Sequence, residues 1–305
     1  MRVALFVVLL LFCVTPWASP PIALALGLAL ALTVGNPLGG KTSKPTKVLL
    51  QASVVGLGFG MNLQKVIEAG RTGVLFTIAT IAGTLLLGWL AGRALGVERR
   101  TSHLISSGTA ICGGSAIAAV GPVIEATDEE MSVSLGTVFI LNSIALFIFP
   151  LIGHRLGLTQ NQFGVWAAIA IHDTSSVVGA AAKYGAEALQ IATTIKLTRA
   201  LWIVPLTLGT AFAFKRKSAR VAIPWFILWF VVASIIRTYV PAPAAVFDTL
   251  VHAARIGLTV TLFLIGAGLS RKSIAVVGAR PLILGVLLWV VISCVSLYAV
   301  INLSR

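Results

Sequence analysis

Residues 106–119 read Ser-Ser-Gly-Thr-Ala-Ile-Cys-Gly-Gly-Ser-Ala-Ile-Ala-Ala and lie inside a long apolar segment. The adjacent Gly113 and Gly114 weaken helix continuity, and Thr109 and Ser115 place hydroxyl groups close to them. Small residues alone would indicate tight packing between helices. The clustered hydroxyl groups favour a second interpretation, in which the helix is broken inside a membrane. The free backbone N–H groups at the start of its second half would then face an anion.

The composition of the whole chain indicates a membrane protein built of helices. Of its 305 residues, 58% are hydrophobic and only 10% are charged, and the mean hydropathy is +1.00. Soluble globular proteins carry about 25% charged residues, so these few charges would not cover a soluble surface. Repeated apolar runs reach or approach the ~20 residues that a helix needs to cross the hydrocarbon layer. We therefore expect an all-α, polytopic membrane protein.

The net charge of +14 does not indicate a nucleic-acid-binding protein. The basic residues lie in short connections between apolar segments, which is the pattern of a membrane topology signal and not of a phosphate-binding groove. The three cysteines lie in apolar runs without metal-binding spacing, and neither a His-x-x-x-His pair nor a phosphate loop occurs. We expect no nucleic acid partner, no metal and no cofactor.

About eleven transmembrane helices are predicted, of which the second and third are short for a full crossing. The first apolar segment has an alternative as a cleaved signal peptide, because Arg2 precedes a run that ends near Ala18 and Ser19. The Pro20-Pro21 pair suits a turn between helices equally well, and we favour a retained helix. The predicted spans are residues 3–17, 22–35, 48–61, 73–96, 103–124, 131–153, 163–184, 188–214, 221–239, 247–270 and 280–302.

Basic residues are unevenly divided between the two sides of this arrangement, and the positive-inside rule turns that division into an orientation. The N-terminus and every second connection after it carry Arg2, Lys41, Lys44, Lys47, Arg93, Arg99, Arg100, Arg155, Lys215, Arg216, Lys217, Arg220, Arg271, Lys272 and Arg280. The opposite side carries only Lys65, Arg71, Lys183, Arg237 and Arg305. The N-terminus is therefore predicted to be cytoplasmic and the C-terminus extracytoplasmic.

Asp173 is a costly residue, since an aspartate within a membrane span costs about 2.5–3.5 kcal/mol on insertion scales. It lies with His172 near the middle of residues 163–184, and Ser175 and Ser176 follow it. One interpretation makes Asp173 the group that couples transport to a proton or cation, with His172 able to titrate near neutral pH. The other is a structural ion pair or a position near the interface. We favour the coupling role.

Lys196 and Arg199 are three residues apart and therefore share one face of a helix. Both lie well away from the basic end of their span. Buried cations need anions, so we expect them either to attract a substrate or to pair with Asp173.

A fourth polar feature follows at helical spacing, where Asp248, His252, Arg255 and Thr259 form one stripe on an otherwise apolar helix. The first two would lie in the interface if the helix crosses straight. Arg255 is deeper in the span, and we expect it to have an interior role.

Two of these strings resemble the motifs of a known family. GTAICGGSAIAA at residues 108–119 and HDTSSVVGAA at residues 172–181 are similar to those of the YeiH-type family, whose members are described as sulfate exporters. The whole chain resembles that family in length, span pattern and order of these segments. The family is grouped with the bile acid and arsenite transporter superfamily. The resemblance therefore implies two inverted five-helix repeats whose unwound fourth helices cross near the bilayer midplane.

Applied to this chain, the resemblance implies a single transmembrane domain over residues 1–305. It would consist of an extra N-terminal helix over 1–20, a first repeat over 21–155 and an inverted second repeat over 160–305. The fifth and tenth spans would form the crossing pair, broken at Gly113-Gly114 and at Gly266–Gly268.

Together these features predict a secondary transporter in the plasma (inner) membrane. It would export a small inorganic or organic anion, such as sulfate or a sulfonate, by alternating access coupled to a proton or sodium. His172 and Asp173 are the predicted ion-coupling residues. The predicted substrate-binding residues supply backbone donors, hydroxyl groups and charge: Thr109, Gly113, Gly114, Ser115, Ser175, Ser176, Lys196, Arg199 and Arg255.

Two other classes remain as alternatives. A passive anion channel would need the same cations and hydroxyl groups. An intramembrane enzyme is the weakest candidate, because His172 and Asp173 as helix neighbours would point about 100° apart. We therefore predict no catalytic residues. Membrane lipid is the expected surrounding partner, and a homo-oligomer stays open.

Overall fold

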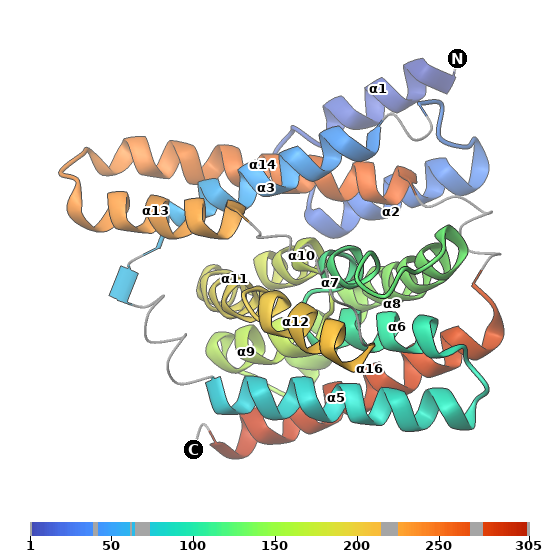
Figure 1. Ribbon diagram of the computed structural model, residues 1–305. Coiled ribbons are helices and arrows are strands. Elements are labelled where there is room, and N and C mark those ends of the chain that lie inside the picture. Colours follow the sequence, from blue (N-terminus) through green and yellow to red (C-terminus); the bar gives the residue numbers. More distant parts are fainter. Residues whose placement is uncertain are drawn as a thin grey trace.

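The computed structural model describes residues 2–38, 42–61, 63–64, 74–214, 225–268 and 277–303, which form helices joined by short connections (Figure 1). The predicted all-α class is confirmed for this part of the chain. The helices are α1 (Arg2–Phe12), α2 (Pro20–Thr33), α3 (Ser43–Gly58), α5 (Val74–Ala94), α6 (Arg99–Ala110), α7 (Gly114–Val120), α8 (Asp128–Arg155), α9 (Gln160–Ala170), α10 (Thr174–Tyr184), α11 (Ala186–Ala200), α12 (Ile203–Ala213), α13 (Trp225–Tyr239), α14 (Ala244–Gly268) and α16 (Ala279–Leu303).

Each predicted span coincides with one helix or with two consecutive helices. In the described part of the chain, five helices are long and apolar enough to cross a membrane: Phe76–Ala94, Glu129–Arg155, Ala186–Ala213, Ala244–Gly268 and Ala279–Asn302. The chain therefore has the helices of a multi-pass membrane protein, and a total of eleven crossings stays a prediction. Several basic residues behind the predicted orientation lie outside the described residues, namely Lys41, Lys65, Arg71, Lys215, Arg216, Lys217, Arg220, Arg271, Lys272 and Arg305.

The helices form two layers, which Figure 1 shows one above the other. Helices α1, α2, α3, α13 and α14 make the first layer, in which α14 packs against α2 and α3, and α13 packs against α3. The second layer contains α5 to α12 and α16. Helix α10 contacts both α14 and α2, and α2 also contacts α8, so these helices join the layers.

Close backbone contact holds α2 and α14 together in the first layer. A Cβ atom on Gly266 of α14 would lie 2.5 Å from the Leu24 carbonyl oxygen of α2, and Gly27 approaches the Phe263 carbonyl in the same way. Such spacing is typical of small-residue contacts between membrane helices. The Phe6 ring of α1 lies 5.3 Å from the Phe263 ring, so the N-terminal helix packs in this layer too.

Helices α5 and α6 of the second layer also approach closely, because serine side chains of α6 pack against glycines of α5. The Ser102 hydroxyl of α6 donates to the Gly88 carbonyl of α5 at 2.8 Å. Added Cβ atoms on Gly88 and Gly92 would collide with the Ser106 and Ser102 hydroxyl groups, respectively. Glycine at both α5 positions is therefore required for α6 to lie where it does.

Capping boxes fix the starts of α8 and α9. The Thr127 hydroxyl accepts from the Glu130 N–H at 3.2 Å, while the Glu130 carboxylate accepts from the Thr127 N–H at 2.6 Å. Thr159 and Gln162 repeat this arrangement at the start of α9. Both starts satisfy N–H groups that a helix otherwise leaves without partners.

Three predicted spans are divided between two helices. Residues 188–214 have only a short turn between α11 and α12, at Leu201 and Trp202, and the other two are interrupted more widely. The first is divided into α6 and α7 between Ala110 and Gly114, as the glycine pair predicts. The second is residues 163–184, divided into α9 and α10 between Ala170 and Thr174.

The predicted break of the tenth span is wrong. Helix α14 runs without interruption from Ala244 to Gly268, and the glycines at 266 and 268 lie in its last turn. Gly266 serves the close contact with α2 and not a break. The interrupted helix that meets α6–α7 is therefore α9–α10, which follows it after only one intervening helix, α8. The two inverted repeats, with their boundaries at 21–155 and 160–305, stay a prediction.

Candidate functional site

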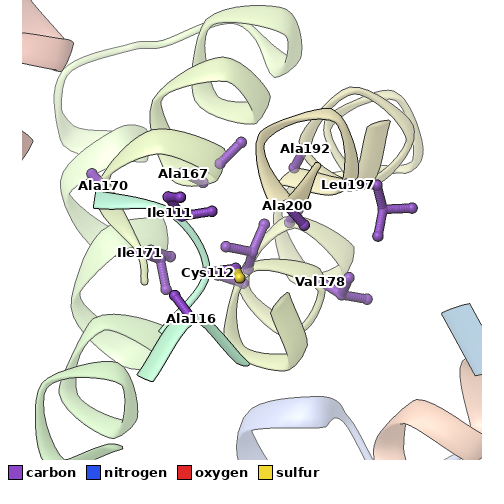
Figure 2. Close-up of a cluster of buried hydrophobic side chains, with 14 of the residues drawn as sticks. Ile111, Cys112, Ala116, Ala167, Ala170, Ile171, Val178, Ala192, Leu197 and Ala200 are labelled. Carbon is purple, nitrogen blue, oxygen red and sulfur yellow. The ribbon is translucent and has the colours of Figure 1, made fainter. Parts of the chain in front are cut away.

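The two helix interruptions meet at Gly113. This residue has φ 64° and ψ −125°, a conformation that side chains rarely adopt. A Cβ atom there would lie 3.2 Å from Val138 Cγ1 of α8 and 3.3 Å from Asp173 Cα. Figure 2 shows Ile111 and Cys112 of the first interruption in one buried cluster with Ile171 of the second. Glycine is thus needed both for the turn and for the contact between the two interruptions, here called the crossing.

Asp173 begins helix α10 as its N-cap. Its Oδ2 atom accepts from the backbone N–H groups of Ser175 at 3.1 Å and Ser176 at 3.3 Å, and also from the Ser175 hydroxyl. A carboxylate at this position is stabilised by the positive end of the helix. The structure therefore brings the predicted residues Asp173, Ser175 and Ser176 together, with both serines buried and the carboxylate partly exposed.

Asn142 of α8 holds the backbone of the second interruption. Its Oδ1 atom accepts from the His172 N–H at 3.0 Å and from the Asp173 N–H at 3.3 Å. One side chain thus satisfies two N–H groups that no helical turn satisfies here. The His172 side chain itself is fully buried, whereas sequence reasoning placed it beside Asp173 on a continuous helix.

The two cations of α11 each hold the end of one interrupted helix. Lys196 Nζ donates to the carbonyl oxygens of Ile171 at 2.8 Å and Ala168 at 3.2 Å, at the end of α9. Arg199 Nη2 donates to the Ala110 carbonyl at 2.6 Å, at the end of α6. The exposed fractions of the two side chains are 0% and 1%. Both cations therefore lie at helix ends that carry partial negative charge.

Pairing with Asp173, one of the two alternatives predicted for these cations, is not seen as a direct ion pair between the described residues. Among the residues that the structure describes, the one ion pair joins Arg100 and Glu130 at 3.9 Å. The charges of Arg199 and Asp173 nevertheless lie near enough to act on Lys196. The crossing thus contains two buried cations and one carboxylate without a direct ion pair.

Several buried polar atoms around the crossing have no hydrogen-bond partner within the described chain. Buried polar atoms normally have one, so such a concentration marks a place with free hydrogen-bonding capacity. The atoms are Ser107 Oγ, Thr109 Oγ1, Asn142 Nδ2, both ring nitrogens of His172 and Arg199 Nε. This set includes donors that suit an oxyanion.

The other predicted site residues divide into two groups. Gly114 begins α7, Ser115 is exposed directly after it, and Thr109 is fully buried in the last turn of α6, so all three lie at the crossing. Arg255 does not: it is exposed on α14 in the first layer and has no hydrogen bond or ion pair from its side chain to the described residues. An interior partner for Arg255 is not found.

Sequence reasoning missed two residues of the crossing. Asn142 supports the second interruption, and Thr80 of α5 accepts from Arg199 Nη1 at 3.1 Å. The second interruption itself had a signal in Asp-Thr-Ser-Ser at residues 173–176, since aspartate is a preferred N-cap.

The comparisons with known proteins agree on a family. The family model described as "Conserved hypothetical protein 698" matches residues 3–285. A protein named "UPF0324 membrane protein" from Bacteroides thetaiotaomicron is 59% identical over 286 residues, which cover 92% of this chain and 86% of that protein. A protein with the same name from Porphyromonas gingivalis is 58% identical, with 93% and 87% covered.

A third relative, "UPF0324 membrane protein GSU2818" from Geobacter sulfurreducens, is 50% identical over 299 residues, with 98% of this chain and 96% of the relative covered. No solved structure matches the chain. The resemblance carried by residues 108–119 and 172–181 is thereby confirmed. The chain belongs to the UPF0324 family of membrane proteins, the YeiH-type family.

Proposed function

We propose that this protein is a secondary transporter that moves a small anion, such as sulfate or a sulfonate, and binds it at the crossing. The observation that carries the proposal is the pair of fully buried cations, Lys196 and Arg199, opposed by the single carboxylate of Asp173. Isolated charges are expensive in a protein interior unless other charges compensate them. A bound anion would supply that compensation.

The charges at the helix ends support an anion over a cation. A helix end carries roughly half a unit charge, so the full positive charge of each cation exceeds the partial negative charge of the carbonyl end that it caps. The full negative charge of Asp173 likewise exceeds the partial positive charge at the start of α10. The crossing therefore has two groups with net positive charge, at Lys196 and Arg199, and one with net negative charge, at Asp173. The low dielectric of the interior strengthens their effect on a ligand. The unpartnered N–H groups of Asn142 and Arg199 add donors of the kind that an oxyanion accepts.

Asp173 is the group that we assign to coupling. Protonation of its carboxylate would remove the negative charge and leave the crossing more positive. A bound proton and a bound anion would therefore favour each other's binding. The carboxylate is partly exposed, which gives a proton access to it. Sodium coupling is the other form of the proposal, with the same carboxylate as ligand.

Alternating access is proposed to involve the two layers, because the crossing lies in the second layer and α10 contacts α2 and α14 of the first. A passive anion channel would need the same crossing but no coupling. We propose no catalytic activity: His172 has no hydrogen bond from its ring to the described residues. The proposed location is the plasma (inner) membrane, with a cytoplasmic N-terminus.

A binding screen tests the anion directly. Purified protein would be heated with sulfate, sulfite, sulfonates, thiosulfate or carboxylates, and a ligand bound only by the folded state raises the unfolding temperature as its concentration rises. We expect at least one anion to do so and to show saturable counterflow in liposomes. Stabilisation by none of the anions, together with no counterflow, would overturn the proposal, whereas anion flux without counterflow would favour the channel.

Coupling is tested by Asp173→Asn, which keeps an oxygen for the N-cap and removes the charge. We expect anion transport by this variant to lose its dependence on pH, or on sodium if sodium is the coupled ion. Asp248→Asn is the matched control, since that carboxylate is exposed on α14. An unchanged dependence on both ions in Asp173→Asn would assign the residue a structural role only.

A further inference from the structure

Both interrupted helices end at a carbonyl group that a side chain of α11 holds. At the end of α9, Lys196 Nζ uses two of its three N–H donors on Ile171 and Ala168. Ile171 directly precedes His172 and Asp173, so this contact fixes the backbone that leads to the carboxylate. The hydrogen bonds are charge-assisted and buried, which makes them strong and geometrically defined.

Arg199 does the same for α6 and adds a third helix. Its Nη2 atom holds Ala110, the last residue of α6, and its Nη1 atom donates to the Thr80 hydroxyl of α5 at 3.1 Å. The planar guanidinium group therefore joins α5, α6 and α11 at one point. A lysine would not reproduce this, because it lacks the fixed fork of donors.

The two contacts lie one helical turn apart on the same helix. Residues three apart share a helix face, so α11 sets the distance between the ends of α6 and α9. The same segment continues into α12, which contacts α7, while α11 contacts both α9 and α10. It thereby touches parts of both interrupted helices.

We propose that Lys196 and Arg199 are positioning residues, which lock the two helix interruptions in register through α11 by the N–H groups that they donate to the helix-end carbonyls. The inference rests on the proposed function only in that the ligand of the crossing is the transported anion. The lock uses two N–H groups of Lys196 and the terminal nitrogens of Arg199, and within the described chain it leaves Arg199 Nε free for another acceptor. The positive charge of the pair also attracts the anion through the electrostatic field, which the low dielectric of the interior strengthens.

Cys112 provides a native reporter of this lock. It lies in the first interruption, its exposed fraction is 1%, and it is a free thiol. Its sulfur is near enough to Lys196, Arg199 and Asp173 for their charges to act on it. If the end of α6 is released, Cys112 should become accessible to a thiol reagent.

The experiment measures the rate at which a maleimide labels Cys112 in the full-length protein in detergent, with Cys13 and Cys294 replaced by serine. We expect Arg199→Met and Lys196→Met each to speed labelling by tenfold or more. Lys183→Met is the matched control, because it removes a positive charge from an exposed position at the end of α10, and it should label like the parent.

Thr80→Val supplies a variant that keeps both charges. It removes the hydrogen bond from Arg199 Nη1 together with the local one that the Thr80 hydroxyl donates to the Thr77 carbonyl, and we expect labelling to accelerate by about threefold. If Arg199→Met and Lys196→Met do not fold, Thr80→Val decides: labelling at the parent rate overturns the proposal. If they fold and label at the parent rate, the proposal is wrong, and a loss of anion binding in the same variants would make both cations ligands only. No labelling outcome depends on an anion, so a failure of the proposed function is recognised separately.

Discussion

Replacement of Gly113 by alanine tests whether the crossing depends on its backbone geometry. The residue has φ 64° and ψ −125°, where a non-glycine residue costs of order 1–3 kcal/mol. The added methyl group would also lie 3.2 Å from Val138 and 3.3 Å from Asp173 Cα. The second contact is with backbone, which cannot rotate away, and overpacking of this kind costs about 1–3 kcal/mol. We expect a total loss of about 3 kcal/mol, at the lower end of the two terms combined.

The unfolding temperature in detergent measures this loss. A loss of about 3 kcal/mol corresponds to a fall of roughly 5 °C for a chain of this length. Gly209→Ala is the control, because Gly209 lies in α12 with nothing within 4 Å of an added Cβ atom. Removing a glycine from a helix stabilises it by about 0.5–1 kcal/mol, so this control should unfold at the same temperature or slightly higher. Equal unfolding temperatures for Gly113→Ala and the parent would show that the two interruptions do not meet as described.

Three further predictions concern the support of the crossing, the first layer and the orientation. Asn142→Leu leaves two buried N–H groups without an acceptor and should lower the unfolding free energy by about 2–4 kcal/mol, measured by thermal unfolding; no change would remove Asn142 from its supporting role. Gly266→Val should disrupt the α2–α14 contact and reduce the yield of folded protein, whereas Gly268→Ala, with open space around it, should not; equal yields would contradict the contact. A reporter fused after Arg305 should be extracytoplasmic and one near Lys215 cytoplasmic, and finding both on one side would refute the predicted orientation.

The sequence predicts the helical class and the first interruption well, because apolar length and paired glycines have direct physical consequences. It predicts the second interruption poorly. Ile171, His172 and Asp173 contain no glycine, and the carboxylate looks like an intramembrane charge instead of a helix cap. Its capping role depends on the N–H groups of Ser175 and Ser176, which a continuous helix would have used internally. The glycines of α14 mislead for the opposite reason, since they allow helix contact and not interruption.

The partners of the buried cations are the least predictable part of the site. Spacing places Lys196 and Arg199 on one helix face, but three of their four acceptors are backbone carbonyls that lie 25 to 89 positions earlier in the chain. A carbonyl has no signature in the sequence, because every residue has one. Arg255 shows the reverse case. Its place in a polar stripe predicts an interior role, yet it is exposed in the first layer.

The serine–glycine contacts between α5 and α6 have a consequence for how the chain is inserted during synthesis. Helix α6 begins with Arg99 and Arg100 and carries hydroxyl groups along its length, so it is poorly suited to enter lipid alone. Helix α5 is apolar and offers the carbonyl of Gly88 as an acceptor for the Ser102 hydroxyl. The two helices should therefore leave the translocon as a hairpin, with α5 shielding α6 from the acyl chains. Bulky residues in place of the α5 glycines would then impair membrane integration before the crossing has formed.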